Sequence, residues 1–419
     1  MTADDLVSQA AARIDARDYQ SALALCDRAL EANPANVSAL INSGSALLGL
    51  GDPARARRSF NRAINEDPTI ANAWDGLGKA QYDLRDPEAA AKAFRTAANL
   101  ADEPALSRYH RGLALLLNGN FAEGWEDYES RIDVPALGHR RYGKPRWNGE
   151  PLGGKRLLVV AEQGYGDMIQ FARYLPMLNR FGGPVLFEAP ADLIDLFAPL
   201  AEHATLIASD DGSVPDSEFD CYVYLMSLGR ILGTMADTVP ADIPYITAPP
   251  DRINTWRERL GGPGVKTGIA WAGRPTHPQD AQRSMNSALF APLAEIEGVC
   301  LYSLQKDKTT RPLDPALGNR LAADFGPQLT RFAETAAIVA HLDLVITVDT
   351  SLAHLAGALG KPVWTLLPYA PDWRWLLGRD DTPWYPTMRL FRQETAGDWR
   401  SVIERVRDEL AAETAKAKR

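Results

Sequence analysis

The chain has 419 residues, of which 46% are hydrophobic and 24% charged, and its formal net charge is −9. This length and composition predict two or three domains with ordinary cores, so disorder is not the default expectation. The acidic excess argues against a general nucleic-acid binder, because such proteins bind phosphates through lysine and arginine. The opening MTADDLVSQA lacks a signal-peptide pattern and no apolar run is long enough to cross a membrane, so we expect a cytoplasmic protein without a membrane span.

A 34-residue periodicity runs through the first third of the chain. Small residues and aromatic residues recur at this step, as in Gly44, Gly78 and Gly112 and in Phe60, Phe94 and Tyr128. The pattern resembles the tetratricopeptide repeat, a helical hairpin in which small residues allow close helix contact and the aromatic fills the space between hairpins. About four units cover residues 3–132, and we assign residues 1–135 to a repeat domain.

A solenoid of this kind buries its apolar faces only by stacking, and its curved surface commonly binds a peptide or a protein. We therefore expect residues 3–132 to bind a protein or peptide partner. A structural or dimerising arm is the alternative. The repeat pattern stops after Arg131, and the Pro-, Gly- and Arg-rich residues 136–155 are typical of a linker.

From Lys155 onward, short apolar runs alternate with helical stretches, which is the pattern of parallel sheets. The first set of expected strands comprises RLLVVAE, GPVLFEA, ATLIAS and FDCYVYLMSL. The second set comprises KTGIAWAG, VCLYSLQ, RLAADF, DLVITVD, PVWTLLP and MRLFRQ. Residues 238–252, TVPADIPYITAPPDR, separate the sets with four prolines. We expect two Rossmann-like domains, 156–250 and 251–395, with a cleft at the carboxyl ends of both sheets.

The first expected strand is followed by QGYGDMIQFARYLP. Gly164 and Gly166 permit a tight turn, and Asp167 opens the next helix. A Gly-x-Gly sequence alone is weak evidence for a site, and Asp167 by itself reads as a helix N-cap.

A more specific signal lies in residues 343–362, DLVITVDTSLAHLAGALGKP. The apolar run is typical of a central parallel strand, and SLAHLAGAL is helical and ends at Gly360. Asp349, Thr350 and Ser351 therefore lie at a helix N-terminus, where unpaired amides and a partial positive charge favour phosphate. His354, one turn into the helix, can point toward the same ligand, although capping and packing alone would be an ordinary role for such residues.

This stretch resembles the donor-site motif of glycosyltransferase family 9, the heptosyltransferase-like enzymes of the GT-B fold. The matching residues are Asp349, Thr350, Ser351, His354, Leu355, Ala356, Leu359, Gly360 and Pro362, with Ser351 in place of the commoner glycine. The resemblance implies an α-solenoid followed by a GT-B fold, a bacterial protein, and binding of a nucleotide-sugar diphosphate at Asp349, Thr350, Ser351 and His354. It also implies that Gly164, Tyr165 and Gly166 form an acceptor-side loop and that Asp167 is the catalytic base.

Cationic side chains should stabilise the negative charge of the diphosphate leaving group. Arg283 follows the strand KTGIAWAG, and Gln305 and Lys306 end the strand VCLYSLQ. Side chains at strand carboxyl ends face the cleft, so we expect these three residues to bind the donor. Gly273, Pro275, His277, Asp280, Arg283 and Ser284 also resemble a pattern of tetratricopeptide-linked transferases. Ordinary surface charge is the alternative.

No Asp-x-Asp follows an expected strand, and no His, Cys and carboxylate set has metal-ligand spacing. We therefore expect no metal and no cofactor besides the nucleotide-sugar co-substrate. Residues 396–419 are expected to form an amphipathic C-terminal helix, which in GT-B proteins commonly packs back across the first α/β half.

These observations predict a glycosyltransferase that moves a sugar from a nucleotide sugar to a protein hydroxyl presented by the repeats, by metal-independent inverting transfer. One alternative is transfer to a lipid-linked glycan or a polysaccharide. Another is a non-catalytic protein-binding module in which only the repeats function.

Overall fold

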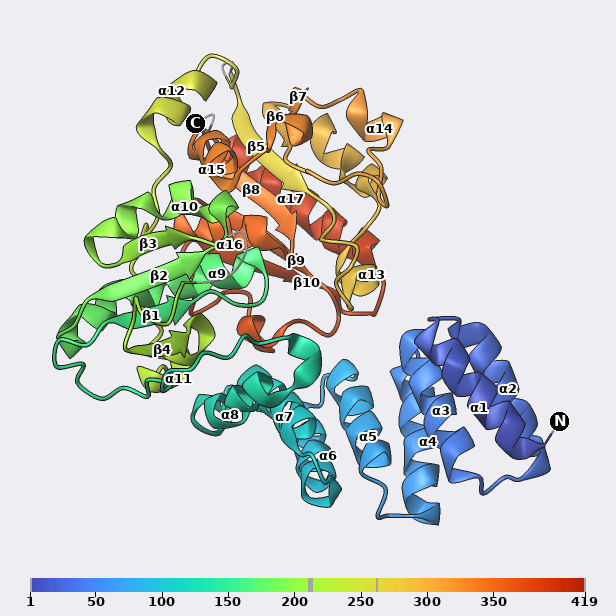
Figure 1. Ribbon diagram of the computed structural model, residues 1–419. Coiled ribbons are helices and arrows are strands. Elements are labelled where there is room, and N and C mark those ends of the chain that lie inside the picture. The colour runs from blue at the N-terminus through green and yellow to red at the C-terminus, as the bar shows by residue number, and fades with distance from the viewer. Residues whose placement is uncertain (1, 210–213, 261–262, 418–419) are drawn as a thin grey trace. The chain divides into compact units, whose positions relative to one another are not determined.

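The computed structural model describes residues 2–209, 214–260 and 263–417 (Figure 1). The remaining positions, which belong to the predicted domains and to the end of the predicted C-terminal helix, lie outside the described residues. The chain forms two compact units. The repeat unit comprises Met1–His139 and Ala370–Leu377, and the two-sheet unit comprises Arg140–Tyr369 and Gly378–Arg419.

The repeat unit contains four helical hairpins, coloured blue to teal in Figure 1. Their helices are α1 Ala3–Asp15, α2 Tyr19–Ala32, α3 Val37–Gly49, α4 Pro53–Glu66, α5 Ala71–Asp83, α6 Pro87–Leu100, α7 Ala105–Leu117 and α8 Phe121–Tyr128. Short polar side chains begin several of them: Asp52 and Asp86 each accept a hydrogen bond from the amide three residues later, and a proline follows each cap. Helices α1, α3, α5 and α7 contact one another and form one face of the unit, called here the A-helix face.

The periodic glycines and aromatics contact each other as the repeat predicts. A Cβ at Gly44 would lie 2.6 Å from the Phe60 ring, and a Cβ at Gly78 would lie 2.5 Å from the Phe94 ring. At Gly112 the obstacle is the backbone nitrogen of Tyr128, at 2.5 Å. Only glycine allows these close helix contacts, so the predicted tetratricopeptide hairpins are confirmed.

The segment Ala370–Leu377 belongs to the repeat unit, although the sequence placed it in the second α/β domain. Trp373, in the short helix η8 Trp373–Trp375, is 1% exposed and packs edge-on against Trp125, with ring centroids 5.3 Å apart. Its ring also lies 5.9 Å from Tyr128, and the Tyr82 hydroxyl donates to the carbonyl of Pro371 at 3.4 Å. This segment thus packs on the end of the last hairpin, where burial of the tryptophan holds it within the repeat unit.

The two-sheet unit begins with a parallel sheet of order β3-β2-β1-β4. Its strands are β1 Leu157–Val160, β2 Val185–Ala189, β3 Thr205–Ala208 and β4 Cys221–Tyr224. The connecting elements are α9 Tyr165–Phe171, η3 Ala172–Phe181, α10 Ala191–Phe197, η4 Ala198–Glu202, η5 Leu225–Ser227 and α11 Leu228–Ile231. Strands β2 and β3 follow on one side of β1, whereas β4 lies on its other side. The end of β1 is therefore a topological switch point, where doubly wound folds bind ligands.

The second sheet is also parallel and has the order β10-β9-β8-β5-β6-β7. Its strands are β5 Val265–Ala270, β6 Val299–Ser303, β7 Ala323–Asp324, β8 Leu344–Val348, β9 Val363–Leu367 and β10 Met388–Arg392. Helices α12 Pro250–Trp256, α13 Asp280–Arg283, η6 Ser287–Glu295, α14 Pro315–Gly318, α15 Phe332–Ala340 and α16 Ser351–Ala358 connect or precede them. This is the doubly wound six-strand order, with its switch point between β5 and β8. Both predicted strand sets are confirmed.

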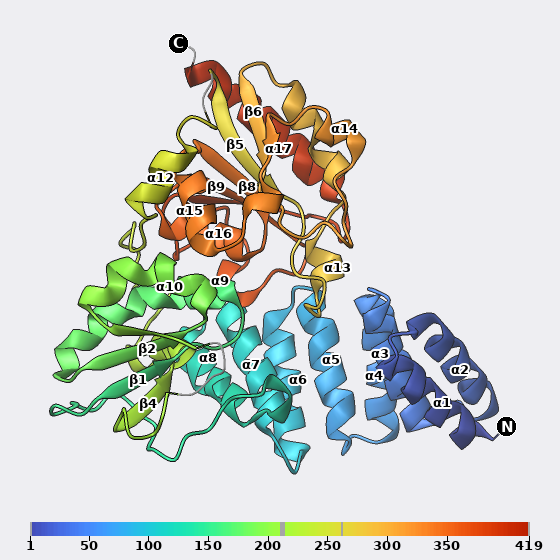
Figure 2. The ribbon, with the colours of Figure 1, turned by 45° about the horizontal axis from the view of Figure 1, so that its top comes forward.

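The C-terminal helix α17 Trp399–Ala417 packs against the second sheet (Figure 2). Its buried residues Val402, Val406 and Leu410 share a core with Ile269 of β5 and Ile346 of β8. The expectation that this helix packs across the first half is therefore wrong, because its apolar stripe finds its partner on the sheet that it directly follows. Among the described residues, the structure has no helix that is long and apolar enough to span a membrane.

Candidate active site

The Gly164–Asp167 turn follows β1 at the switch point of the first sheet. Gly164 is the N-cap of α9, and its amide donates to a carboxylate oxygen of Asp167 at 2.8 Å. Asp167 thus has the capping role that its position alone suggests, and it is only partly buried. The cap fixes the carboxylate at the carboxyl end of β1, where a substrate would lie in a doubly wound fold.

The motif of residues 349–354 follows β8 at the second switch point. Thr350 is the N-cap of α16, and its hydroxyl accepts a hydrogen bond from the amide of Leu352 at 3.3 Å. Asp349, Thr350 and Ser351 are half-buried, whereas the remainder of the helix through Ala358 is buried. The predicted helix N-terminus is therefore present, with its polar residues at the surface of the sheet's carboxyl edge.

Gly166 brings the two motifs together. A Cβ at this position would lie 2.9 Å from Cδ2 of His354, 3.6 Å from its Nε2 and 3.4 Å from the Cα of Ser351. Helices α9 and α16 pack against each other, so the absent side chain at position 166 is what lets them approach. The turn after β1 and the start of α16, which are far apart in the sequence, therefore lie against each other.

His354 is 5% exposed, and its other ring nitrogen has a defined partner. Nδ1 lies 3.0 Å from the hydroxyl of Tyr385, a residue of the loop between β9 and β10. Burial raises the pKa of Tyr385 well above its ordinary value, although the nearby Arg173 partly opposes the rise. The phenol is therefore neutral at physiological pH and retains its proton.

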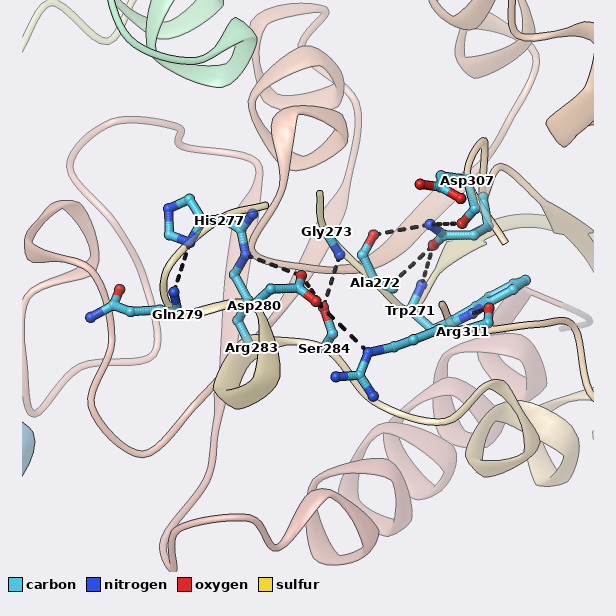
Figure 3. A network of polar contacts seen from close by, with 11 residues as sticks. Trp271, Ala272, Gly273, His277, Gln279, Asp280, Arg283, Ser284, Asp307 and Arg311 are labelled. Carbon is cyan, nitrogen blue, oxygen red and sulfur yellow. Dashed lines mark hydrogen bonds and ion pairs between the residues drawn. The ribbon is translucent and has the colours of Figure 1, made fainter. Parts of the chain in front are cut away.

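A second group of polar residues surrounds the ends of β5 and β6 (Figure 3). Gln305 is 4% exposed, and its side-chain oxygen accepts from the amides of Trp271 and Ala272, each at 3.0 Å. Its side-chain nitrogen donates to the carbonyls of Ala272 at 3.1 Å and Asp307 at 2.9 Å. These four bonds use the full capacity of an amide. Gln305 therefore joins the two strand-end loops, and its amide is engaged with backbone.

Two guanidinium groups flank one carboxylate in the same network (Figure 3). Asp280 is 8% exposed, with Nε of Arg283 at 3.9 Å and Nε of Arg311 at 3.9 Å. Both Nε atoms are buried and have no hydrogen-bond partner within the described part of the chain. Asp280 also accepts from the Ser284 hydroxyl at 2.7 Å, which in turn accepts from the amide of Gly273 at 2.9 Å. Two cations beside one anion leave an uncompensated positive charge, which suits an anionic ligand.

Gly273 lies in close contact with the side chain of Arg283. A Cβ there would lie 2.6–2.8 Å from the guanidinium atoms of Arg283. The guanidinium therefore rests directly on the backbone that follows β5, beside the second switch point.

Two of the predicted residues contact other parts of the unit. Lys306 is exposed, and its ammonium donates to the carbonyl of Thr330 at 3.4 Å. The Tyr165 hydroxyl donates to Asp192 at 3.3 Å, and its ring packs on Phe332 with centroids 5.0 Å apart. Neither contact belongs to the His354 or Arg283 clusters.

The sequence did not single out Arg311 or Arg173, and it offered Tyr385 only as one of several aromatic residues that could shape a sugar or base pocket. Arg311 lies in KTTRPLDP, where no motif marks it, and it was not among the cations that we expected to bind the donor. Tyr385 lies in an aromatic-rich stretch that core packing explains equally well. Among the described residues, no group of three or more His, Cys, Asp and Glu side chains is placed to hold a metal ion.

Comparison with known families agrees with this geometry. Residues 13–79 and 76–133 match two models of the tetratricopeptide repeat. Residues 297–392, which include β8, the 349–354 motif and Tyr385, match the model of glycosyltransferase family 9 (heptosyltransferase). The chain carries tetratricopeptide repeats and a glycosyltransferase family 9 domain.

A curated relative matches most of the chain. Protein FlbA of Caulobacter vibrioides is 31% identical over 330 residues, which amount to 73% of this chain and 55% of that protein. The chain thus spans little more than half the length of this relative.

Solved structures resemble each part separately. The ADP-heptose lipopolysaccharide heptosyltransferase II of E. coli is 14% identical and has a TM-score of 0.44, covering 63% of this chain and all of that one. A family 9 glycosyl transferase from Veillonella parvula is 13% identical with a TM-score of 0.45, covering 64% of this chain and all of that one. For the repeats, the structure of MamA is 26% identical with a TM-score of 0.28 and covers 31% of this chain and 75% of that one.

Proposed function

We propose that the protein is a glycosyltransferase that moves a sugar from a nucleotide-sugar donor to a protein hydroxyl by metal-independent inverting transfer. The observation that carries this proposal is the contact of Gly166 with Ser351 and His354, which joins the carboxylate turn after β1 to the helix N-terminus after β8. A carboxylate on one side and an anion site on the other are the two parts that such a transfer requires.

In this proposal Asp167 is the general base. Its carboxylate takes the proton of the acceptor hydroxyl while that oxygen attacks the anomeric carbon. The bond between the anomeric carbon and the donor phosphate breaks on the opposite face, and the nucleoside diphosphate leaves with the bonding electrons. The hydrogen bond from the Gly164 amide holds the carboxylate in place.

The negative charge that develops on the diphosphate is met from two directions. The amides and hydroxyls at the start of α16 supply donors, and His354 lies one turn further along. Arg283 and Arg311 supply positive charge that Asp280 balances only in part. Gln305 contributes indirectly in this scheme, because its four backbone contacts hold the loops that carry these groups.

The repeat unit is proposed to hold the protein acceptor. Its A-helix face carries a polar cluster in which Asp75 of α5 accepts hydrogen bonds from Ser107 at 3.2 Å and contacts His110 at 2.9 Å, both on α7. Lys79 pairs with the same carboxylate at 2.8 Å and remains 44% exposed. Binding an acceptor on the same polypeptide raises its effective concentration at the catalytic unit.

The donor is identified by titrating UDP-, GDP-, ADP- and CMP-linked sugars into the metal-free protein by calorimetry. We expect one nucleotide class to bind the wild type and to bind His354→Ala about tenfold more weakly, the loss of one charge-assisted or buried hydrogen bond. If no nucleotide sugar binds the wild type, with or without an acceptor protein, the proposed function is wrong.

The base is tested by comparing Asp167→Asn with Asp167→Ala. Asparagine can still accept the Gly164 amide hydrogen bond but cannot take a proton, whereas alanine loses both roles. We expect both variants to lose turnover by about a thousandfold, while only alanine lowers the melting temperature. An Asp167→Asn variant that turns over normally would show that the carboxylate serves only as the helix cap.

The acceptor is tested with a charge reversal on the A-helix face. Lys79→Glu should raise the KM for a protein acceptor severalfold and leave transfer to a small hydroxyl acceptor unchanged. Lys92→Glu is the control, because Lys92 also pairs with a carboxylate four residues away, Glu88 on α6, but in a pair whose two side chains are both exposed. Equal effects of Lys79→Glu on both acceptors would exclude the repeats as the acceptor site and would favour a glycan acceptor.

A further inference from the structure

Four elements of the two-sheet unit converge on the buried guanidinium of Arg173, which lies in η3 and is 4% exposed. It donates from Nε to the carbonyl of Gln170 at 2.9 Å and from Nη1 to the carbonyls of Pro240 and Trp384, each at 2.7 Å. Its Nη2 donates to the Tyr245 hydroxyl at 3.2 Å. Among the described residues, no carboxylate pairs with Arg173. A buried cation without an anion is costly, so its neutral partners must be held firmly around it.

Tyr385 is one of these partners. Its ring centroid lies 4.7 Å below the guanidinium carbon of Arg173, and the ring packs on α16 so closely that a Cβ at Gly357 would approach it to 2.6 Å. The ring is fully buried between these two contacts. Its hydroxyl is therefore fixed in position next to Nδ1 of His354, at 3.0 Å.

Counting protons gives a direction to this hydrogen bond. The Tyr245 hydroxyl donates to the carbonyl of Ile169 at 3.0 Å, so its single proton is used, and its oxygen already accepts from Arg173. Tyr245 therefore does not donate to Tyr385, whose hydroxyl lies 3.5 Å away. The proton of Tyr385 has its nearest acceptor at Nδ1 of His354. When Nδ1 accepts, the proton of a neutral imidazole is on Nε2.

We propose that Tyr385 is a positioning residue that donates to Nδ1 of His354 and holds this histidine in the Nε2–H tautomer, with Arg173 and Tyr245 fixing Tyr385 in turn. The Cδ2–Nε2 edge of the imidazole is the edge that faces Gly166 and the acceptor-side turn. In this tautomer Nε2–H of His354 is a proton donor on the edge of the ring that faces the site. This inference rests on the proposed function for the group that Nε2–H of His354 would bind, namely a phosphate oxygen of the nucleotide sugar.

The test is the tautomer of His354, read from the ring nitrogen shifts of protein labelled with [¹⁵N]histidine at pH 8, where imidazole is ordinarily neutral. His354→Gln identifies the signals. We expect the wild type to show one Nε2–H tautomer and Tyr385→Phe to show a mixture. An Nδ1–H tautomer in the wild type, or an unchanged spectrum in Tyr385→Phe, would overturn the proposal.

Tyr174→Phe is the matched control. Tyr174 is also buried, lies next to Arg173, and hydrogen-bonds Thr234 at 2.9 Å, so its variant loses a comparable hydroxyl without touching His354. We expect Tyr385→Phe to lower kcat/KM for the donor by about five- to tenfold, and Tyr174→Phe to leave the tautomer unchanged. Failure of the wild type to bind any nucleotide sugar would instead refute the proposed function, and the tautomer measurement would still decide the role of Tyr385. A variant that fails to fold is recognised by its His341 and His110 signals, and the tautomer of the wild type, which can overturn the proposal by itself, is then the deciding measurement.

Discussion

Gly166 and His354 are in contact in the folded chain, and the imidazole occupies the space that any larger residue at position 166 would need. The glycine thus serves the packing of α9 on α16 as well as the turn that precedes α9.

Gly166→Ala should damage the site more than the fold. The added methyl group would lie 2.9 Å from Cδ2 of His354, so either the ring or the helix must move. We expect about a tenfold or greater loss of kcat/KM and a destabilisation of about 1–3 kcal/mol. Gly318→Ala is the control, because its Cβ would meet only Leu313, at an ordinary 3.5 Å. Steady-state kinetics and urea unfolding measure both effects, and equal behaviour of the two variants would contradict the prediction.

Arg311 should contribute to donor binding although no sequence motif marks it. Its Nε is buried beside Asp280, as is that of Arg283. We expect Arg311→Gln to weaken donor binding by about three- to tenfold and Arg283→Gln by about ten- to a hundredfold, because Arg283 rests on the backbone next to the switch point. Calorimetric titration measures both. Arg320→Gln, which removes an exposed pair with Glu295, should leave the dissociation constant unchanged.

The limits of the sequence prediction follow from the range of the interactions involved. The helical hairpins, both strand sets and the N-terminus of α16 could be predicted, because a 34-residue period, apolar runs and capping residues are local signals. The 349–354 motif could be found for the same reason. The contacts of His354 with Tyr385 and Gly166 could not be predicted, because these residues reach His354 only after both sheets have formed.

Gln305 shows a second limit. Its place at the end of a strand indicated a side chain that faces the cleft, and the strand end is where the structure has it. The sequence does not show that backbone groups of its own loop and of the loop after β5 together use all four hydrogen bonds of the amide. In the same way, the apolar stripe of α17 could be predicted, but which sheet it covers depends on tertiary packing.

The carboxyl group of Asp83 should make the stability of the repeat unit depend on pH. Burial raises its pKa from an ordinary 3.8 to about 6, and nearby Lys79 opposes this only in part. The folded state therefore binds more protons than the unfolded state between these values, so stability falls as pH rises through this window and stays reduced above it. We expect Asp83→Asn to gain about 1–2 kcal/mol at pH 7.5 and little at pH 4. Thermal unfolding at both pH values tests this, and an equal gain at both would contradict it.

Trp373 should stabilise the last tetratricopeptide hairpin. Its ring is almost fully buried against Trp125 and Tyr128. We expect Trp373→Ala to lower the local stability of α7 and α8 by about 3 kcal/mol, which hydrogen exchange of their amides measures. Tyr82→Phe, which removes only the hydroxyl contact with Pro371, should change exchange by much less. Unaltered protection of these amides in Trp373→Ala would show that the stability of the hairpin does not depend on Trp373.

The segment Ala370–Leu377 also determines what happens when the chain is cut by a protease. Because Ala370–Leu377 belongs with the repeats, the polypeptide passes between the two units three times, after His139, after Tyr369 and after Leu377. Trypsin cleavage at exposed Arg141 would therefore yield two fragments, the larger of which still inserts Trp373 into the smaller one. The two fragments should therefore elute together in chromatography until the protein is denatured. A deletion of residues 1–132 would instead leave Trp373 and its neighbours without cover, so loss of transfer in such a truncation would not by itself identify the repeats as the acceptor site.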